Sequence, residues 1–331
     1  MTNRRARFST LWVGLILLAA TACGCLSTMV RKGWNDPGDK RFMSERTFKP
    51  DEMQWLKSTT TIFFIRPEDA PYRALFEAAL ARAWHLTPVK VAPISEINQY
   101  ADRSRYSYFL ISGEWEVFEA KTAANPDLHQ LMQHNRFYLC LVRAGQNPNP
   151  LEGATVYSRS ELHIEFGSLG QFQTMFLNDG PVAYYQAARF RNWSPGQIEM
   201  YLTSVDRDLQ HAFRRWLFED FSDDAQMAKL KTGTLLIPDY VLVDFNKWTG
   251  DESGRHDPAK LLREYKHPYK IVTAGELTDA VASSAGPVYV FDYVRSSSDQ
   301  FVSVFEKSRG MIYRHYRHET YNLDDDDFDL F

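Results

Sequence analysis

Histidines close to carboxylates are the side chains of this chain that could best support acid–base or metal chemistry. His163 and Glu165 are two positions apart in a β-like run over 160–166, so they share one face of the expected strand. Such a pair could bind a metal ion or act as a base with its orienting acid. A metal site needs a third ligand nearby, and a pair that is merely exposed, or satisfied by its neighbours, is the competing interpretation.

A second polar group lies near the C-terminus. His315 and His318 stand among Arg314, Arg317 and Glu319, where a small anion site is one hypothesis. The alternative is a solvated edge strand that its charges keep from aggregating. The His315 region is therefore a candidate site without a defined reaction.

The rest of the sequence holds no motif that commits the chain to one reaction. G-x-S-x-G, H-E-x-x-H, a Walker loop and a dinucleotide fingerprint are all missing. The acidic run 324–327 lacks the spacing and the glycine of a calcium loop, and it predicts a solvated tail. A net charge of −4 gives no basic footprint for nucleic acid. We therefore expect no metal, no cofactor and no nucleic-acid partner.

The N-terminus has the three parts of a secretory signal. Three arginines within residues 4–7 precede an apolar run over 8–22, and Cys23 and Cys25 follow. The run is shorter than the about 20 apolar residues that a membrane-spanning helix needs. A signal peptide over 1–22 is therefore favoured over a permanent transmembrane helix.

The residues around the first cysteine resemble the lipobox of bacterial lipoprotein precursors. The stretch Ala20-Thr21-Ala22-Cys23 places small residues before a cysteine. The resemblance implies that Cys23 receives a diacylglycerol, with fatty acids such as palmitate, before residues 1–22 are cut away. It departs from the usual pattern at Ala20, where leucine is commonest, and Cys25 offers a second frame. The same residues also fit an ordinary A-x-A cleavage site, which would release an unlipidated protein.

The third cysteine, Cys140, has a different setting. It lies in the run 136–142, whose alternating positions are apolar on both faces, as in a buried central strand. We predict a buried structural thiol, because reactive thiols need exposure and nearby positive charge. Three cysteines of this kind predict no disulfide framework.

The body of the chain reads as two tandem α/β units after a tether over 23–50. The first covers 51–231 and the second, smaller one covers 232–331, with the boundary near 221–233. Each approximates β-α-β-α-β-β-β, which predicts mixed sheets. The alternative is a single thioredoxin-like or other α+β domain with insertions, although no C-x-x-C lies at the first strand-to-helix turn.

A weak internal similarity supports the tandem reading. With a constant offset of 180 positions, four residues are identical between 88–111 and 268–291, and 109–111 aligns with 289–291. The identical pairs are Pro88 and Pro268, Lys90 and Lys270, Glu96 and Glu276, and Ser104 and Ser284. An internal duplication is the hypothesis that follows.

Three local sequence patterns predict individual elements more strongly than the internal similarity predicts a duplication. Ser194-Pro-Gly-Gln197 is a capping box that opens a helix whose apolar face continues to residue 217. A second capping box at Thr273 opens another helix, and 301–305 with 311–316 predict an antiparallel hairpin. The first helix is expected to close over the first sheet.

The functional expectation follows mainly from the leader. An exported protein, anchored by lipid in the cell envelope at the outer membrane, would bind or assemble other envelope proteins or glycans. The 14% of aromatic residues permits such a surface, although most of them fall on predicted core faces. The alternative is an envelope hydrolase that uses His163 with Glu165, or the His315 region.

Overall fold

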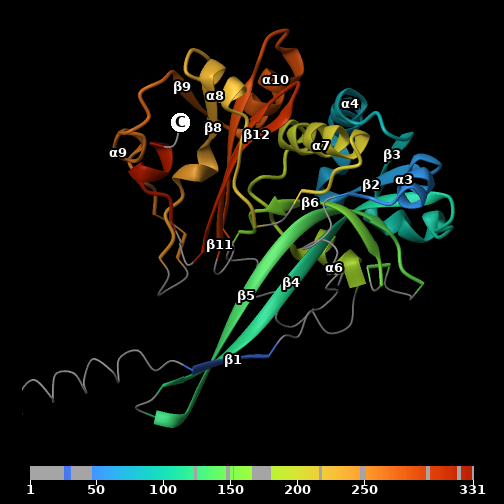
Figure 1. The fold of residues 1–331 in the computed structure, drawn as a ribbon, viewed down its shortest axis with the longest axis horizontal. Helices are drawn as coiled ribbons and strands as arrows, with labels where there is room; N and C mark the ends of the chain where they lie inside the picture. Colours follow the sequence, from blue (N-terminus) through green and yellow to red (C-terminus); the bar gives the residue numbers. More distant parts are fainter. Residues whose placement is uncertain are drawn as a thin grey trace, which may run out of the picture. The chain divides into compact units, whose positions relative to one another are not determined.

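The computed structural model describes residues 26–30, 47–122, 125–146, 150–151, 153–165, 180–215, 218–246, 251–252, 254–295, 299–318 and 322–329. Two compact units are present, residues 1–34 with 114–135 and residues 35–113 with 136–331. In the smaller unit, strand β1 (Leu26–Val30) pairs antiparallel with the second half of strand β4 (Tyr106–Thr122). The larger unit contains two sheets, each with its helices (Figure 1).

The first sheet has the strand order β3-β2-β4-β5-β6. Strand β2 is parallel to β3 and to β4, whereas β6 is antiparallel to β5. The elements in chain order are α3 (Pro50–Lys57), β2 (Thr60–Ile65), η1 (Pro67–Tyr72), α4 (Arg73–Ala83), β3 (Val89–Pro93), η2 (Ile94–Tyr100), β4, β5 (Asn125–Arg143) and β6 (Thr155–Leu162).

The second sheet has the order β9-β8-β10-β11-β12, with the short β7 added beside β12. Strand β8 is parallel to β9 and β10, and β10, β11 and β12 are antiparallel neighbours. The elements are β7 (Phe221–Ser222), α8 (Asp224–Leu230), β8 (Leu235–Pro238), η3 (Asp239–Leu242), α9 (Pro258–Leu261), β9 (Tyr269–Val272), α10 (Ala274–Ser283), β10 (Tyr289–Arg295), β11 (Asp299–Glu306), β12 (Gly310–His318) and η4 (Asp325–Phe328).

The chain is therefore an α/β protein with two tandem β-α-β-α-β-β-β units and mixed sheets. Apart from β1 in the first sheet and β7 in the second, the five strands of each sheet have the same spatial order: second, first, third, fourth and fifth along the chain. Lys90 pairs with Ile62 on the first strand of its sheet, and Lys270 pairs with Leu236 on the first strand of the other. The identical lysines thus occupy equivalent positions, which supports an internal duplication.

The third strand corrects the alignment drawn from the sequence. Ile62 also pairs with Tyr108, and Leu236 pairs with Val290, so Tyr108 is equivalent to Val290. A constant offset of 180 would match Tyr108 with residue 288. The alignment of 109–111 with 289–291 is therefore wrong by two positions, because the second unit has two more residues between its second and third strands.

The first sheet is covered on both faces, which explains its apolar strands. Phe63 lies within about 6 Å, ring to ring, of Phe76 on α4 and of Trp193. The next residue, Phe64, points to the opposite face and contacts Tyr100 of η2. Strand β5 is apolar on both faces for the same reason, and Cys140 is fully buried there, as predicted.

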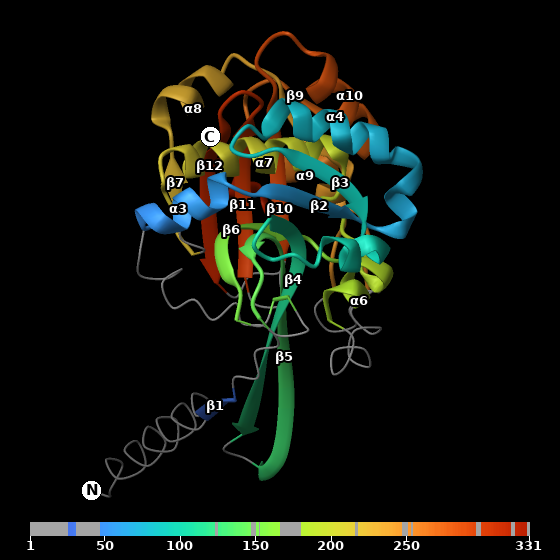
Figure 2. The ribbon, with the colours of Figure 1, turned by 90° about the vertical axis from the view of Figure 1, so that its right-hand side faces the viewer.

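Helix α7 (Pro195–Gln210) joins the two repeats and follows α6 (Gly180–Ala187). It contacts α4 of the first repeat and α10 and β12 of the second (Figures 1 and 2). The N-cap at Ser194 is confirmed, because its side chain accepts a hydrogen bond from Gln197 N. Extension of the helix to residue 217 is wrong. Phe213 N donates to Asp208 O and Ala212 N to Leu209 O, with Ala212 at φ 51°, and this C-terminal motif ends the helix.

Two further predictions have opposite outcomes. The capping box of α10 and the β11–β12 hairpin are confirmed. The solvated acidic tail is confirmed at Asp324 and Asp326, which are exposed, but it is wrong at Asp327, which is fully buried together with Phe328. Asp327 forms an ion pair with Arg317 at 3.0 Å. Phe328 stacks on Phe291 in the core of the second sheet.

Candidate functional site

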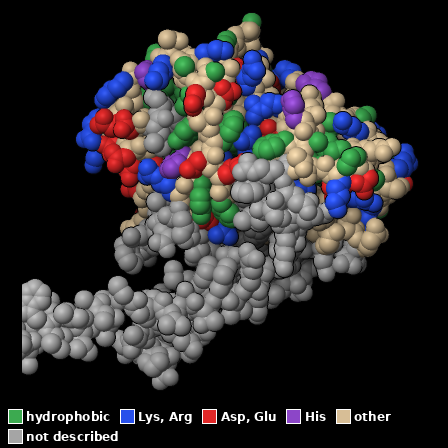
Figure 3. Space-filling model, viewed as in Figure 1, with side chains coloured by type: hydrophobic (Ala, Val, Ile, Leu, Met, Phe, Trp, Pro, Cys, Tyr) green, Lys and Arg blue, Asp and Glu red, His purple; other side chains and the backbone are tan. Residues whose placement is uncertain are grey.

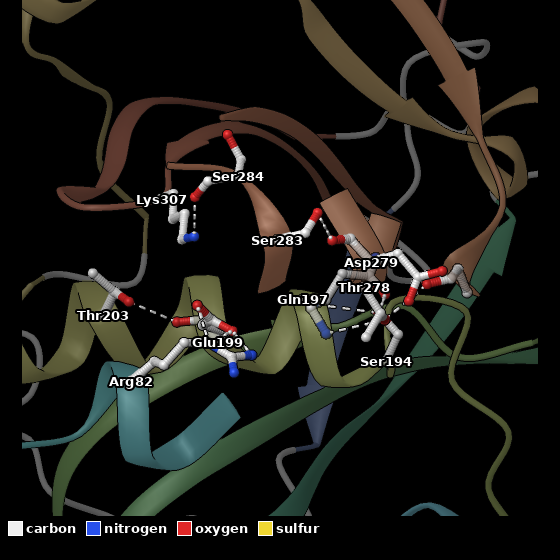
Figure 4. Close-up of polar contacts among 12 residues, drawn as sticks. Arg82, Ser194, Gln197, Glu199, Thr203, Thr278, Asp279, Ser283, Ser284 and Lys307 are labelled. Atoms are coloured by element: carbon white, nitrogen blue, oxygen red, sulfur yellow. Dashed lines mark hydrogen bonds and ion pairs between the residues drawn. The ribbon is translucent and has the colours of Figure 1, made fainter. Parts of the chain in front are cut away.

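A groove of about 640 Å³ runs between the two repeats. One wall is the end of α4 with one side of α7, and the other is the α10–β10 loop with the β11–β12 turn. The volume falls within the range of about 300–1,000 Å³ that is common for ligand sites. Figure 4 shows side chains of both walls, with Arg82 and Glu199 on one and Lys307 and Ser284 on the other.

The wall formed by α7 is a row of polar side chains along one side of the helix. Glu199, Thr203, Asp206 and Gln210 are spaced at i, i+4, i+7 and i+11, which places them on one side of the helix. Glu199 and Asp206 are nevertheless buried, because α4 covers this side. Their burial requires partners, since an isolated buried carboxylate is costly.

Arg82 provides the partner of Glu199. Its Nε lies 3.0–3.1 Å from both carboxylate oxygens, and its Nη2 lies 2.6 Å from Oε2. The Glu199 side chain is only 2% exposed whereas Arg82 is 37% exposed, so the guanidinium covers the carboxylate and faces the groove. Figure 4 shows the two side chains reaching toward one another from α4 and α7.

Asp206 is held by the turn that follows α4. Its Oδ1 accepts hydrogen bonds from the backbone N–H groups of His85 and Leu86, at 2.8 and 2.9 Å. Its Oδ2 accepts one from Gln210 Nε2 at 2.6 Å. The His85 ring lies 3.5 Å from Asp206 and is 60% exposed, so it extends from this turn into the groove.

The opposite wall carries a matching set of polar groups. Lys307 Nζ donates to the backbone carbonyl of Ser284 at 2.8 Å. Glu306 is buried and accepts hydrogen bonds from the N–H and hydroxyl groups of Ser308. The α10–β10 loop presents Ala285 and Gly286, both exposed, to the groove.

The groove therefore suits a hydrophilic ligand. Its acidic groups are committed to protein partners, while Arg82, His85 and Lys307 face the opening. The lining includes hydroxyl groups and backbone atoms but no tyrosine, tryptophan or phenylalanine. Stacking on an aromatic ring, which is common in sugar sites, is not offered here. Hydrogen bonds and charge would have to supply the recognition.

His163, a sequence candidate, lies in the core where the two repeats meet. It is 2% exposed, its Nδ1 lies 3.0 Å from the Tyr293 carbonyl oxygen, and the Tyr240 and Tyr293 rings pack edge-on against it. Burial, reinforced by the positive charges of Arg295 and Arg191, holds the pKa of His163 well below its ordinary value of 6.5. A neutral, enclosed imidazole of this kind has no exposed face for a substrate.

Glu165 and His315 have separate surroundings. Glu165 is 37% exposed and pairs with Arg191 at 3.3 Å. His315 Nδ1 lies 3.2 Å from the Asp220 carboxylate, and its Nε2 accepts a hydrogen bond from Arg317. The structure places none of these three candidates in the groove.

The remaining sequence candidates add no site. Cys23, Cys25 and the predicted signal peptide over 1–22 lie outside the described residues. Within the described part of the chain, no three His, Cys, Asp or Glu side chains are arranged to hold a metal ion. The view in Figure 3 shows acidic and basic side chains interspersed over the described surface.

The groove residues were missed by sequence reasoning. The stripe of Glu199, Thr203, Asp206 and Gln210 has the spacing of an ordinary solvent-exposed helix face, and that reading is the default for such a pattern. Arg82 stands at a comparable exposed position of its own helix. Only the packing of α4 on α7 turns these residues into a site, and no local signal specifies that packing.

Known proteins supply no further guide. No protein-family model, curated protein or solved structure matches this chain. Among the helices within the described ranges, none combines the length and the apolar character needed to cross a membrane. The groove and the predicted signal peptide are therefore the two features of the chain that bear on its function.

Proposed function

We propose that this chain is a lipid-anchored protein of the bacterial cell envelope, held at the outer membrane through Cys23, and that it binds or assembles another envelope component. The leader with its lipobox-like Ala20-Thr21-Ala22-Cys23 supports the anchor. The groove between the repeats carries the binding part of the proposal, because both repeats contribute to it and its acidic groups are already satisfied.

A polar segment of another envelope protein is the ligand that the groove favours. The charges and hydroxyl groups of the groove match those of a hydrophilic peptide. A glycan is the second candidate, because the groove lining has no aromatic ring on which a sugar could stack. An envelope hydrolase is the alternative from another class. Nothing in the surroundings of His163, Glu165 or His315 favours it, because each has partners of its own.

The anchor can be tested by mass and by fractionation. Cys23→Ala should abolish the acyl mass and move the protein from the membrane to the soluble fraction, because a diacylated cysteine contributes two buried acyl chains. Cys25→Ala is the matched control and should remain lipidated. Wild-type protein that begins at Cys23 without lipid and is wholly soluble would refute the anchor. A start at Cys25 would only move the frame.

The groove can be tested by filling it. Ala285→Arg places a long side chain at the exposed rim of the groove and should abolish complementation of a deletion strain at normal protein abundance. Ala228→Arg, at an exposed position of α8 that does not line the groove, is the matched control and should complement fully. Equal activity of both variants would rule out the groove as the binding site.

The catalytic alternative makes the opposite prediction. Glu165→Ala, His315→Ala and His163→Ala should each leave the cellular role intact once abundance is matched, whereas removal of a general acid or base typically costs about 10²–10⁴ in rate. Abundance is measured by immunoblot, since His163→Ala also removes a buried ring. Loss of the role from any of these changes at normal abundance would place the hydrolase first.

A further inference from the structure

An exposed apolar patch lies on the side of α4 that also lines the groove. Tyr72 and Leu75 form this patch, and the two residues are 58% and 49% exposed. Leu75 stands seven positions, or two helical turns, before Arg82, so both side chains point to the same side of α4. Arg82 is part of the groove lining. The same side of the helix therefore leads from the polar groove to the apolar patch.

Helix α7 lies beside α4, and the two helices run in the same direction (Figures 1 and 2). Near the start of both, the rings of Phe76 and Trp193 lie 6.3 Å apart. Further along both helices, Arg82 forms its ion pair with Glu199. Leu75 therefore lies beside the start of α7, and a segment that leaves the groove along these two helices reaches the apolar patch.

The groove itself offers a positive charge that the protein does not neutralise. Lys307 Nζ donates to the carbonyl of Ser284, the C-cap of α10, and no carboxylate among the described residues forms an ion pair with it. This carbonyl holds the ammonium in place and leaves two of its three donors for a ligand. The carboxylates of the lining, Glu199, Asp206 and Glu306, are buried and hydrogen-bonded within the protein.

We propose, on the basis of the binding function proposed for the groove, that the groove and the apolar patch together bind one segment of a partner protein, in which an acidic and a large apolar side chain are about three residues apart. Two turns of α4 separate Arg82 from Leu75 by roughly 10 Å, which an extended chain covers in about three residues. The acidic side chain binds Lys307 and Arg82, which face the groove from opposite walls (Figure 4). The apolar side chain covers Leu75 and Tyr72.

The surface around the patch favours a polypeptide over a lipid bilayer. Glu68 on η1 and Glu77 on α4 are about half exposed, and they pair with Arg66 and Arg73 at 2.7 and 2.8 Å. The surroundings of the patch therefore offer no excess of positive charge to anionic lipid head groups. A glycan, in turn, carries no large apolar side chain that would cover Leu75.

The test is a selection of random peptides, displayed on phage, for binding to the full-length protein in detergent. Peptides that also bind the Ala285→Arg variant are removed. The remaining peptides should share an acidic and a large apolar residue about three positions apart. A synthetic peptide of this consensus should bind Lys307→Gln and Leu75→Ser each about tenfold more weakly than wild type, measured by fluorescence anisotropy.

Matched variants separate the two contacts from general effects of substitution. Lys307→Gln keeps a donor for the Ser284 carbonyl and removes only the charge, whereas Lys307→Arg keeps the charge and should bind the peptide nearly as wild type does. Tyr269→Ser removes an apolar side chain that is 40% exposed on β9. Lys266→Gln removes an exposed charge outside the groove. Both should leave the affinity unchanged.

Failure of the proposed function and failure of the segment chemistry give different results. If Ala285→Arg complements the deletion strain, the groove is not the binding site and both proposals fall. If Ala285→Arg does not complement, but no acidic and apolar consensus emerges or Lys307→Gln and Leu75→Ser bind the peptide as wild type does, only the segment chemistry is wrong.

Two further results would assign the patch to another occupant and overturn the proposal. One is a dimer in gel filtration that Leu75→Ser dissociates, because a second copy would then cover the patch. The other is binding of the Cys23→Ala protein to vesicles of phosphatidylethanolamine and phosphatidylglycerol that Leu75→Ser abolishes, because the patch would then contact lipid.

Discussion

Glu161→Gln should lower the free energy of unfolding by about 3–5 kcal/mol, the usual cost of removing one partner from a buried ion pair. Glu161 on β6 and Arg314 on β12 form two parallel hydrogen bonds between the repeats, and their side chains are 8% and 2% exposed. Without the carboxylate, the Arg314 guanidinium stays buried over the Phe301 ring and loses both hydrogen bonds to Glu161. Urea denaturation of wild type and variant measures the difference.

Two further variants show whether burial is the cause. Glu77→Gln removes one partner of the exposed Arg73–Glu77 pair, whose side chains are about half exposed, and should cost less than about 1 kcal/mol. Glu161→Leu with Arg314→Met removes both buried charges and should be less destabilising than Glu161→Gln alone. If Glu161→Gln costs no more than Glu77→Gln, the pair does not hold the repeats together.

The sequence was sufficient to predict those helices and strands whose ends are marked by residues close together in the chain. The hairpin over 301–316 was predicted because two runs of β-branched and aromatic residues flank a turn signal. The capping boxes at Ser194 and Thr273 were predicted because their hydrogen bonds connect residues three positions apart. The order of these elements then gave the tandem α/β architecture.

Features that depend on distant contacts were not accessible in this way. Helix α7 ends in a left-handed residue, a position where glycine is usual. Here the residue is Ala212, so no stop signal was visible. Asp327 belongs to an acidic run that reads as solvated, yet Arg317 and Gln300 stabilise it in the interior. Their partners lie on other strands, and no spacing along the chain reveals them.

The candidate site was the least predictable part for the same reason. Sequence reasoning selects residues by chemical type, and it selected His163 because histidine beside glutamate is a common catalytic pattern. The fold instead encloses His163 between two tyrosines and uses it for packing. The groove is built from Glu199 and Arg82, whose ordinary surface-like spacing carries no such signal.

Asp292→Asn should remove a large pH dependence from the stability of the body. Asp292 is buried on β10, where burial raises the pKa of its carboxyl to about 6 although a hydrogen bond from Tyr240 at 2.8 Å opposes the shift. The ordinary pKa is 3.8. Between these two values the folded protein binds the proton and the unfolded chain does not, so stability falls as pH rises from about 4 through 6. The loss is on the order of 3 kcal/mol above pH 7.

The difference in unfolding free energy between wild type and Asp292→Asn, measured by urea denaturation from pH 4 to 8, isolates this effect. Other groups, including the buried His163, titrate alike in both proteins and cancel. Wild type should lose stability relative to the variant as pH rises from about 4, and the loss should level off above about pH 6. Tyr240→Phe removes a donor that favours the charged carboxylate, so in that background the loss should level off at a higher pH. A difference that stays constant from pH 4 to 8 would show that Asp292 titrates in the folded protein as it does in the unfolded chain, and that the meeting point of the two repeats tolerates its charge.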